Sequence, residues 1–215
     1  MTDSNCLRKM KKKLGFPHTI IEISDVEILQ DIIHDEALKT FSTYFPAEAV
    51  IRREEMLQDS RYEAVYRFPE EYEGRIISVK NVLNIGGKTD FQLIDNHSIR
   101  IYNYDDSLNG DSVVINAKVI HKKDLSTIPI NQEDIFLEYC TILLAEQILP
   151  IKKEFARLGS QIGDIEMSTD VIEKYADKKD DFKTTNFYNS AKLSKRFPLT
   201  FSAPYAGSNI GNVVY

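Results

Sequence analysis

Residues 130–159 read INQEDIFLEYCTILLAEQILPIKKEFARLG, and they decide the architecture that we predict for the chain. Apolar residues recur through this stretch at helical spacing and form a stripe so wide that we expect a helix with two buried sides. Pro150 lacks a backbone N–H and its ring crowds the carbonyl of Glu146, so the helix should kink or begin again there. At ~1.5 Å per residue it should be roughly 40 Å long.

Both ends of this predicted helix carry boundary signals. Asn131 can act as the N-cap, because its side-chain oxygen can accept a bond from a first-turn amide. Ile130 and Ile135 occupy the two positions of a hydrophobic staple. Lys152 suits the negative end of the helix dipole, and Gly159 suits the position after the last turn. We expect a central core helix; the sharper alternative is a helix that lines a ring or is shared between subunits.

Composition sets the broad class of the protein. With 42% hydrophobic and 28% charged residues, the 215-residue chain can fold around one sizeable core or two small ones. The net charge of −6 argues against nucleic-acid binding by the chain as a whole. Cys6 and Cys140 provide neither a disulfide framework nor zinc spacing and favour a reducing place of synthesis. No apolar run reaches the ~18 residues of a membrane span, so no membrane contact is expected.

Residues 1–23 are predicted to be a basic N-terminal arm and the stretch that leads into the first domain. Five cations lie within six residues of this arm, and such a cluster favours DNA or an acidic protein as its partner. The alternative is a solvated or locally docked tail. The five cations are Arg8, Lys9, Lys11, Lys12 and Lys13.

Residues 24–183 are predicted to be a single α+β domain that opens with a helix. Ser24 and Glu27 have the spacing of a capping box, in which each side chain satisfies a backbone donor of the other residue. Apolar residues then follow at helical spacing until Pro46, which ends the helix. The expected stripe consists of Val26, Leu29, Ile33, Ala37, Phe41 and Tyr44.

The period changes to alternation between residues 50 and 121, which predicts an antiparallel β meander. Turn residues separate the strands, and too few helices intervene for a parallel sheet. The predicted strands are 49–57, 62–68, 75–83, 90–93, 98–104 and 112–121. After the long Pro-kinked central helix, a C-terminal helix is expected, with a stripe that includes Val171, Tyr175 and Phe182.

Residues 184–215 are predicted to be an extended C-terminal arm. Its final part, residues 197–215, contains no charged side chain and no helical or strand period. It is too apolar for a typical disordered tail, so we expect it to lie across a neighbouring subunit; the alternative is an arm folded over its own domain. The expected interface residues are Phe197, Phe201, Tyr205, Val213 and Tyr215.

Catalytic and ligand-binding motifs are missing from the pattern. Gly87-Lys88-Thr89 imitates the end of a phosphate-binding loop, but the glycine required five residues earlier is Val82. Asp105 could begin a calcium loop, but its twelfth position is Asn116 instead of glutamate. The four histidines lie far apart in the sequence. We therefore expect no catalytic residues, no cofactor and no metal.

The order of these features resembles virion structural proteins of tailed bacteriophages, of the neck or head–tail connector type. The resemblance covers roughly residues 24–182 and contains no diagnostic motif, so no functional residue is carried over. The stretches that carry it are Phe41–Pro46 (FSTYFP), Tyr66–Pro69 (YRFP), Arg75–Val79 (RIISV), Phe136–Tyr139 (FLEY) and Gly163–Met167 (GDIEM).

This resemblance implies a non-enzymatic subunit that forms a homo-oligomeric ring in the virion and is made in the host cytoplasm. Its neighbours would be portal, neck or tail proteins, and the basic arm would face packaged DNA or an acidic partner. One alternative is a baseplate or tail-end adaptor. Another is an α+β enzyme or ligand-binding module. The hints of such a module are limited to three residues near one strand end: His97, Tyr102 and Tyr104.

Overall fold

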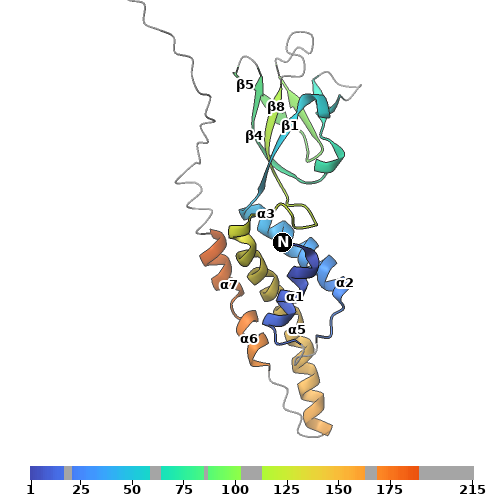
Figure 1. Cartoon of the computed structure of the whole chain (residues 1–215), viewed down its shortest axis with the longest axis vertical. Coiled ribbons are helices and arrows are strands. Elements are labelled where there is room, and N and C mark those ends of the chain that lie inside the picture. Colours follow the sequence, from blue (N-terminus) through green and yellow to red (C-terminus); the bar gives the residue numbers. More distant parts are fainter. Residues whose placement is uncertain (17–20, 59–63, 85–86, 103–112, 163–168, 189–215) are drawn as a thin grey trace, which may run out of the picture.

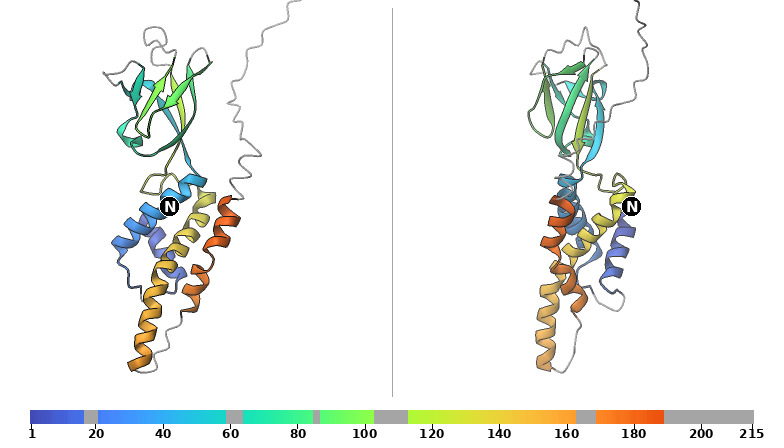
Figure 2. Two further views of the ribbon diagram at one scale, coloured as in Figure 1. Left: turned by 180° about the vertical axis from the view of Figure 1, so that it is seen from behind. Right: turned by 90° about the vertical axis from the view of Figure 1, so that its left-hand side faces the viewer.

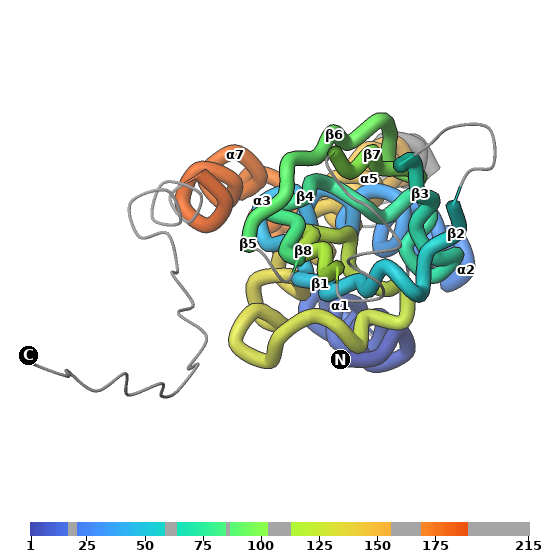
Figure 3. Tube along the Cα trace, turned by 90° about the horizontal axis from the view of Figure 1, so that it is seen from above, coloured from blue at the N-terminus to red at the C-terminus, as the bar shows by residue number. Residues whose placement is uncertain are grey.

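The helices gather in one half of the molecule and the strands in the other half (Figure 1). This arrangement confirms the predicted α+β class. The computed structural model describes residues 1–16, 21–58, 64–84, 87–102, 113–162 and 169–188. Viewed along the long axis, the strands lie over the helices, with α7 to one side of them (Figure 3).

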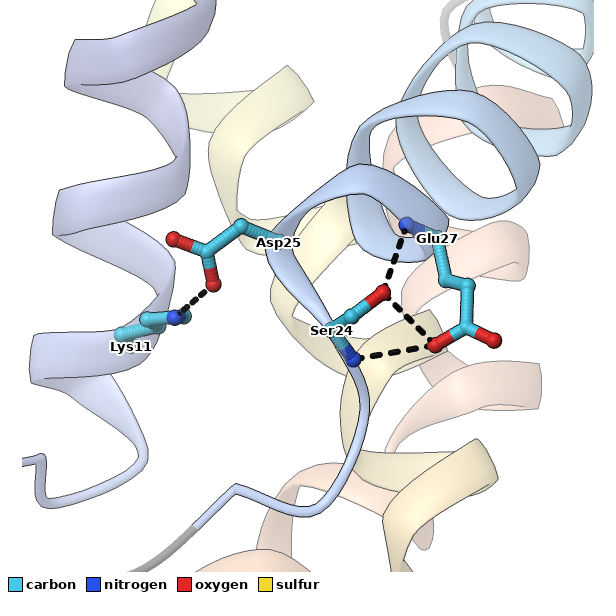
Figure 4. Close-up of polar contacts among 4 residues, drawn as sticks. All are labelled: Lys11, Ser24, Asp25 and Glu27. Atoms are coloured by element: carbon cyan, nitrogen blue, oxygen red, sulfur yellow. Dashed lines mark hydrogen bonds and ion pairs between the residues drawn. The ribbon is translucent and has the colours of Figure 1, made fainter.

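The capping box predicted at the first helix is present (Figure 4). The backbone N–H of Glu27 donates to the Ser24 hydroxyl at 3.2 Å, and the N–H of Ser24 donates to the Glu27 carboxylate at 3.0 Å. Hydrogen bonds from the side chain and the backbone of Ser24 lower the pKa of Glu27. The adjacent Asp25 pairs with Lys11 of the preceding helix.

The helix that follows this box is wound differently from the prediction. It runs as α2 (Asp25–Glu27), the π-helix η1 (Ile28–Ala37) and α3 (Leu38–Tyr44). The wider π turn joins residues five positions apart, and the buried positions 28, 33 and 38 recur at that interval. Val26, which the predicted stripe includes, lies in α2 before the π-helix and is 61% exposed.

All six predicted strand segments contain strands, and every pairing between the described strands is antiparallel. In spatial order, one sheet consists of β1 (Ala47–Arg52), β8 (Val114–Val119), β4 (Ile76–Asn84) and β5 (Gly87–Thr89). The other consists of β2 (Leu57–Gln58), β3 (Val65–Arg67), β7 (Ser98–Ile101) and β6 (Phe91–Leu93). Short 3-10 turns lie at Arg53–Glu55 and Glu70–Tyr72.

The strand order departs from the predicted meander. The first strand, β1, pairs with the last, β8, from Ala47 opposite Val119 to Arg52 opposite Val114. Strand β8 also pairs with β4, and β3 pairs with β7. In a meander, only neighbours in sequence would pair. Because of this pairing, the start of β1 and the end of β8 lie at the same end of the sheet, next to the helices.

The long central helix is α5 (Glu133–Ile162), preceded by a 3-10 turn at Ile130–Gln132. It continues through Pro150 as one helix, so the alternative of a new helix beginning there is wrong. Its first half is buried on several sides, which confirms the prediction from the wide stripe. The buried side chains in this half are Phe136, Leu137, Tyr139, Cys140, Thr141, Ile142, Leu143, Leu144, Ala145 and Ile148.

Three boundary predictions for this helix are wrong. Ile130 is 88% exposed, so it does not form a staple with Ile135. The residue that caps the preceding turn is Pro129, and Asn131 lies inside that turn. Gly159 lies inside α5, which ends three residues later. Local capping signals therefore located the helix without defining its ends.

The N-terminal residues form a helix, α1 (Asp3–Lys13), and not an arm. One face of this helix buries Cys6, Leu7 and Met10, and Leu14 follows it into the same core. The spacing of three to four residues places the apolar side chains together and leaves the cations on the other faces. The locally docked alternative describes this segment correctly.

The predicted C-terminal helix is divided into α6 (Asp170–Ala176), α7 (Lys179–Phe182) and the π-helix η6 (Lys183–Tyr188). Val171, expected in its buried stripe, is exposed, and Ile172 is buried instead. Phe187, predicted to lie in the extended arm, is fully buried and lies 4.9 Å from the Tyr139 ring. Residues 184–188, the first residues of the predicted arm, are therefore helical, and residues 189–215 lie outside the described part.

Buried apolar residues form two clusters within the region predicted to be one domain. One cluster lies among the helices and includes Phe41, Phe136 and Leu143. The other lies between the two sheets and includes Ile51 and Ile99. The two halves lie end to end (Figure 2). The domain boundaries at residues 24 and 183 stay a prediction.

Candidate subunit interface

The second half of α5 begins beside the other helices, and its C-terminal end extends past them (Figures 1 and 2). An apolar hollow of about 480 Å³ lies on this half, and we call it the α5 hollow. It is lined by Pro150, Ile151, Glu154 and Phe155. These residues form two pairs with a spacing of four, so they lie side by side on one face of the helix.

Two properties of the α5 hollow suit contact with another protein segment. The Phe155 side chain is 49% exposed, and an aromatic side chain at a surface hollow is typical of contact sites in interfaces. Pro150 has no N–H, so the carbonyl of Glu146 receives no helical hydrogen bond from that position. The hollow therefore combines exposed apolar area with a break in the regular helical bonding.

Other faces of this half of α5 are held by ion pairs. Lys152 is only 2% exposed, and its amine pairs with the Glu22 carboxylate. Lys153 pairs with Glu173 of α6 at 3.2 Å. Lys152 and Lys153 therefore contact other segments of the helical half, whereas the Phe155 side chain is half exposed.

The buried Lys152 is a feature that sequence reasoning missed, because we expected it to meet the helix dipole. Its position does carry a signal, since residue 152 continues the spacing of four set by Leu144 and Ile148. A lysine at the next position of a buried stripe indicates a carboxylate partner. That partner, Glu22, lies 130 positions away in the sequence and was not predictable from the local pattern.

The five predicted N-terminal contact residues lie on or at the end of α1, and two of them have partners within the described residues. The Arg8 guanidinium donates to the Asn5 side chain at 3.2 Å. Lys11 pairs with Asp25 and lies 5.6 Å from the centre of the Phe16 ring. The remaining three predicted contact residues are Lys9, Lys12 and Lys13. Contact of these residues with DNA or an acidic protein stays a prediction.

The predicted interface residues of the C-terminal arm lie outside the described residues. They are Phe197, Phe201, Tyr205, Val213 and Tyr215. The described chain ends at Tyr188, which is 48% exposed and packs edge-to-face on Tyr44 with 5.7 Å between ring centres. The described chain therefore ends beside α3, at the end of the helical half that faces the strands.

The residues that hinted at a ligand site make local contacts. The Tyr102 hydroxyl donates to the Gln92 side chain at 2.7 Å, and His97 Nδ1 lies 3.3 Å from the Glu73 carboxylate. Tyr104 lies outside the described residues. Across the described ranges, no group of three or more His, Cys, Asp or Glu side chains could hold a metal ion. In the same ranges, no helix has the length and apolar character needed to cross a membrane.

Comparison with known families identifies the class of protein. A family model described as a bacteriophage ring protein matches residues 1–90 and residues 72–201. The two matches together extend over most of the chain and define a phage structural protein. The chain belongs to the bacteriophage ring protein family. Among curated proteins, none matches the chain.

Proposed function

We propose that the protein is a subunit of the ring that connects head and tail at the neck of a phage virion. Membership of the bacteriophage ring protein family is the observation that carries this proposal. The exposed apolar surface of α5 supports it, since a ring subunit needs a surface that meets the next copy. Its other partners would be portal, neck or tail proteins.

The contacts within such a ring are heterologous, because each subunit offers one surface and receives a different one. The C-terminal residues Phe197, Phe201, Tyr205, Val213 and Tyr215 would be the surface that is offered. They belong to the uncharged C-terminal segment, residues 197–215, which has no charged side chain to desolvate when it docks.

The cations of α1 would face the channel of the ring or an acidic neighbour. Lys12 and Lys13 are exposed at the end of the helix, so their amines can reach a partner without disturbing the buried face. Contact with DNA through such amines is electrostatic and independent of base sequence. This character suits DNA that moves through a channel.

Two measurements test the proposed function. Light scattering and negative-stain microscopy of the full chain should show closed rings, alone or after a phage partner is added. Gold-labelled antibodies against the chain should then label the neck of intact virions. Labelling at the far end of the tail would overturn the neck role in favour of the baseplate or tail-end adaptor. A compact monomer that is indifferent to phage partners would overturn the ring itself.

A further inference from the structure

We propose that the α5 hollow receives the uncharged C-terminal segment (residues 197–215) of a neighbouring copy. This inference rests on the proposed ring and names the receiving surface, which family membership does not supply. The hollow and the segment match in chemistry, because both present apolar and aromatic groups. Burial of such surfaces against each other stabilises an interface by roughly 25 cal/mol per Å².

The receiving side is preorganised. The Lys152–Glu22 pair, with a lysine that is only 2% exposed, anchors one face of α5, and Phe155 lies on a regular part of the same helix. A receptor that is already ordered loses less entropy when a segment docks on it. The Phe155 ring can pack against an incoming aromatic side chain.

The offering side has the length and the position to reach another copy. The described chain ends at Tyr188 beside Tyr44, at the end of the helical half nearest the strands. The α5 hollow lies on the second half of α5, which leads toward the opposite end of that half. Residues 189–215 span up to roughly 90 Å when extended, so they can cross from one subunit to the next.

Tyr188, where the described chain ends, lies far along the helical half from the α5 hollow of its own copy. This separation suits exchange of the segment between copies. When each hollow receives the segment of the copy beside it, the contact is heterologous and repeats until the ring closes. Phe201 and Tyr205 are the anchors that the chemistry of the hollow favours, because each offers an aromatic ring and Tyr205 adds a hydroxyl donor. Ser202 directly follows Phe201, and Ser208 lies three positions after Tyr205.

Disulfide cross-linking between full-length chains tests the docking. One sample carries Glu154→Cys, and a second, with a different affinity tag, carries Ser202→Cys or Ser208→Cys. Cys6 and Cys140 are completely buried, so they do not compete for the engineered thiols. The mixture is oxidised mildly and run on non-reducing gels. The control replaces Glu154→Cys by Val26→Cys. Docking raises the effective concentration of the two thiols, so the test mixture should give at least about tenfold more mixed dimer than the control.

Matched variants tie the result to the hollow. Adding Phe155→Asp to the Glu154→Cys chain should reduce the mixed dimer to the level of the control, whereas Phe155→Leu should keep it. Phe155 is half exposed, so neither change should unfold the helix. A bond formed only within one chain, from a doubly substituted protein, would overturn exchange between copies. The proposal would also be overturned if Ser202→Cys and Ser208→Cys both gave no more mixed dimer with Glu154→Cys than with the Val26→Cys control.

Microscopy of the same mixtures separates this inference from the proposed function. Rings without cross-linking above the control would overturn the docking and leave the ring intact. Cross-linked copies without rings, even with phage partners, would support the docking and overturn the connector role.

Discussion

The imidazole Nε2 of His121 lies 2.8 Å from the backbone carbonyl oxygen of Phe45, at the point where the helices meet the sheets. A carbonyl oxygen only accepts, so Nε2 carries the proton. Nδ1 lies 3.0 Å from the Thr127 hydroxyl, which already accepts from the N–H of Lys122 and can therefore donate to Nδ1. The backbone N–H of His121 donates to the Ser42 hydroxyl. This network joins the end of α3 to the chain that leaves β8.

A neutral His121 is what this network requires, and burial lowers the pKa of its imidazole below the ordinary value of 6.5. As the pH falls below about 6.5, the unfolded chain takes up the proton before the folded chain does. The free energy of unfolding should therefore be highest above that pH and decrease as the pH approaches the lowered pKa.

Urea unfolding of the full chain at several pH values from about 7.5 to about 5 checks this expectation. His121→Gln keeps a donor for Phe45 but cannot titrate in this range, so it should lose less stability than the parent as the pH falls. Equal slopes for the two proteins would contradict the role assigned to His121.

Lys152→Ala should destabilise the protein by roughly 2 kcal/mol, since it leaves the mostly buried Glu22 carboxylate without its partner. The double substitution Lys152→Met with Glu22→Gln removes both charges and should recover most of that loss. Chemical denaturation of the three chains measures the difference. A Lys152→Ala chain as stable as the parent would show that the pair is not maintained in solution.

Deletion of residues 197–215 should leave the monomer folded and abolish assembly. The helical core ends with Phe187, so the deletion removes none of the described buried residues. Circular dichroism should match that of the parent, while light scattering should show no ring. Normal assembly of the shortened chain would exclude the C-terminal segment as the offered surface.

Pro150→Ala should give a protein at least as stable as the parent, because alanine restores the helical N–H that proline lacks in the middle of α5. Assembly should weaken, since Pro150 lines the α5 hollow. Thermal unfolding and negative-stain microscopy provide the two measurements. Unfolding of the mutant would instead show that the helical core requires Pro150 to fold.

Thiol reagents should react slowly with the folded chain and rapidly after unfolding in urea. Cys6 and Cys140 are both 0% exposed, and burial raises the pKa of the Cys140 thiol, so little thiolate forms at neutral pH. Colour release from a disulfide reagent measures the rate. The Glu154→Cys chain should add a single fast thiol as an internal control; a fast thiol in the parent would show that the helical core opens.

Local signals account for the parts that could be predicted. The capping box depends on Ser24 and Glu27 alone, and its bonds form within one helical turn, so the sequence identifies it directly. Strand positions followed from alternation along single segments. The pairing of β1 with β8 joins segments more than 60 residues apart and leaves no local mark. The predicted order of strands was wrong for this reason.

The sequence predicted only one side of the interface that we propose. Absence of charge in residues 197–215 is a property of composition and is visible in the sequence. The surface with Phe155 is not, because its exposure depends on which face of α5 the neighbouring helices cover. Lys152 shows the same limit: its burial depends on Glu22, which folding brings to α5 from far away in the sequence.

The sequence by itself determined the α+β class, the helical stretches on both sides of Pro150, the positions of most strands and the uncharged C-terminal segment. All of these follow from periodicity and composition over short windows. The tertiary structure alone decided that the basic N-terminal residues form a packed helix, that β1 pairs with β8, and that Lys152 is buried while Phe155 is exposed. Those outcomes depend on contacts between distant segments, whose energies no local pattern contains.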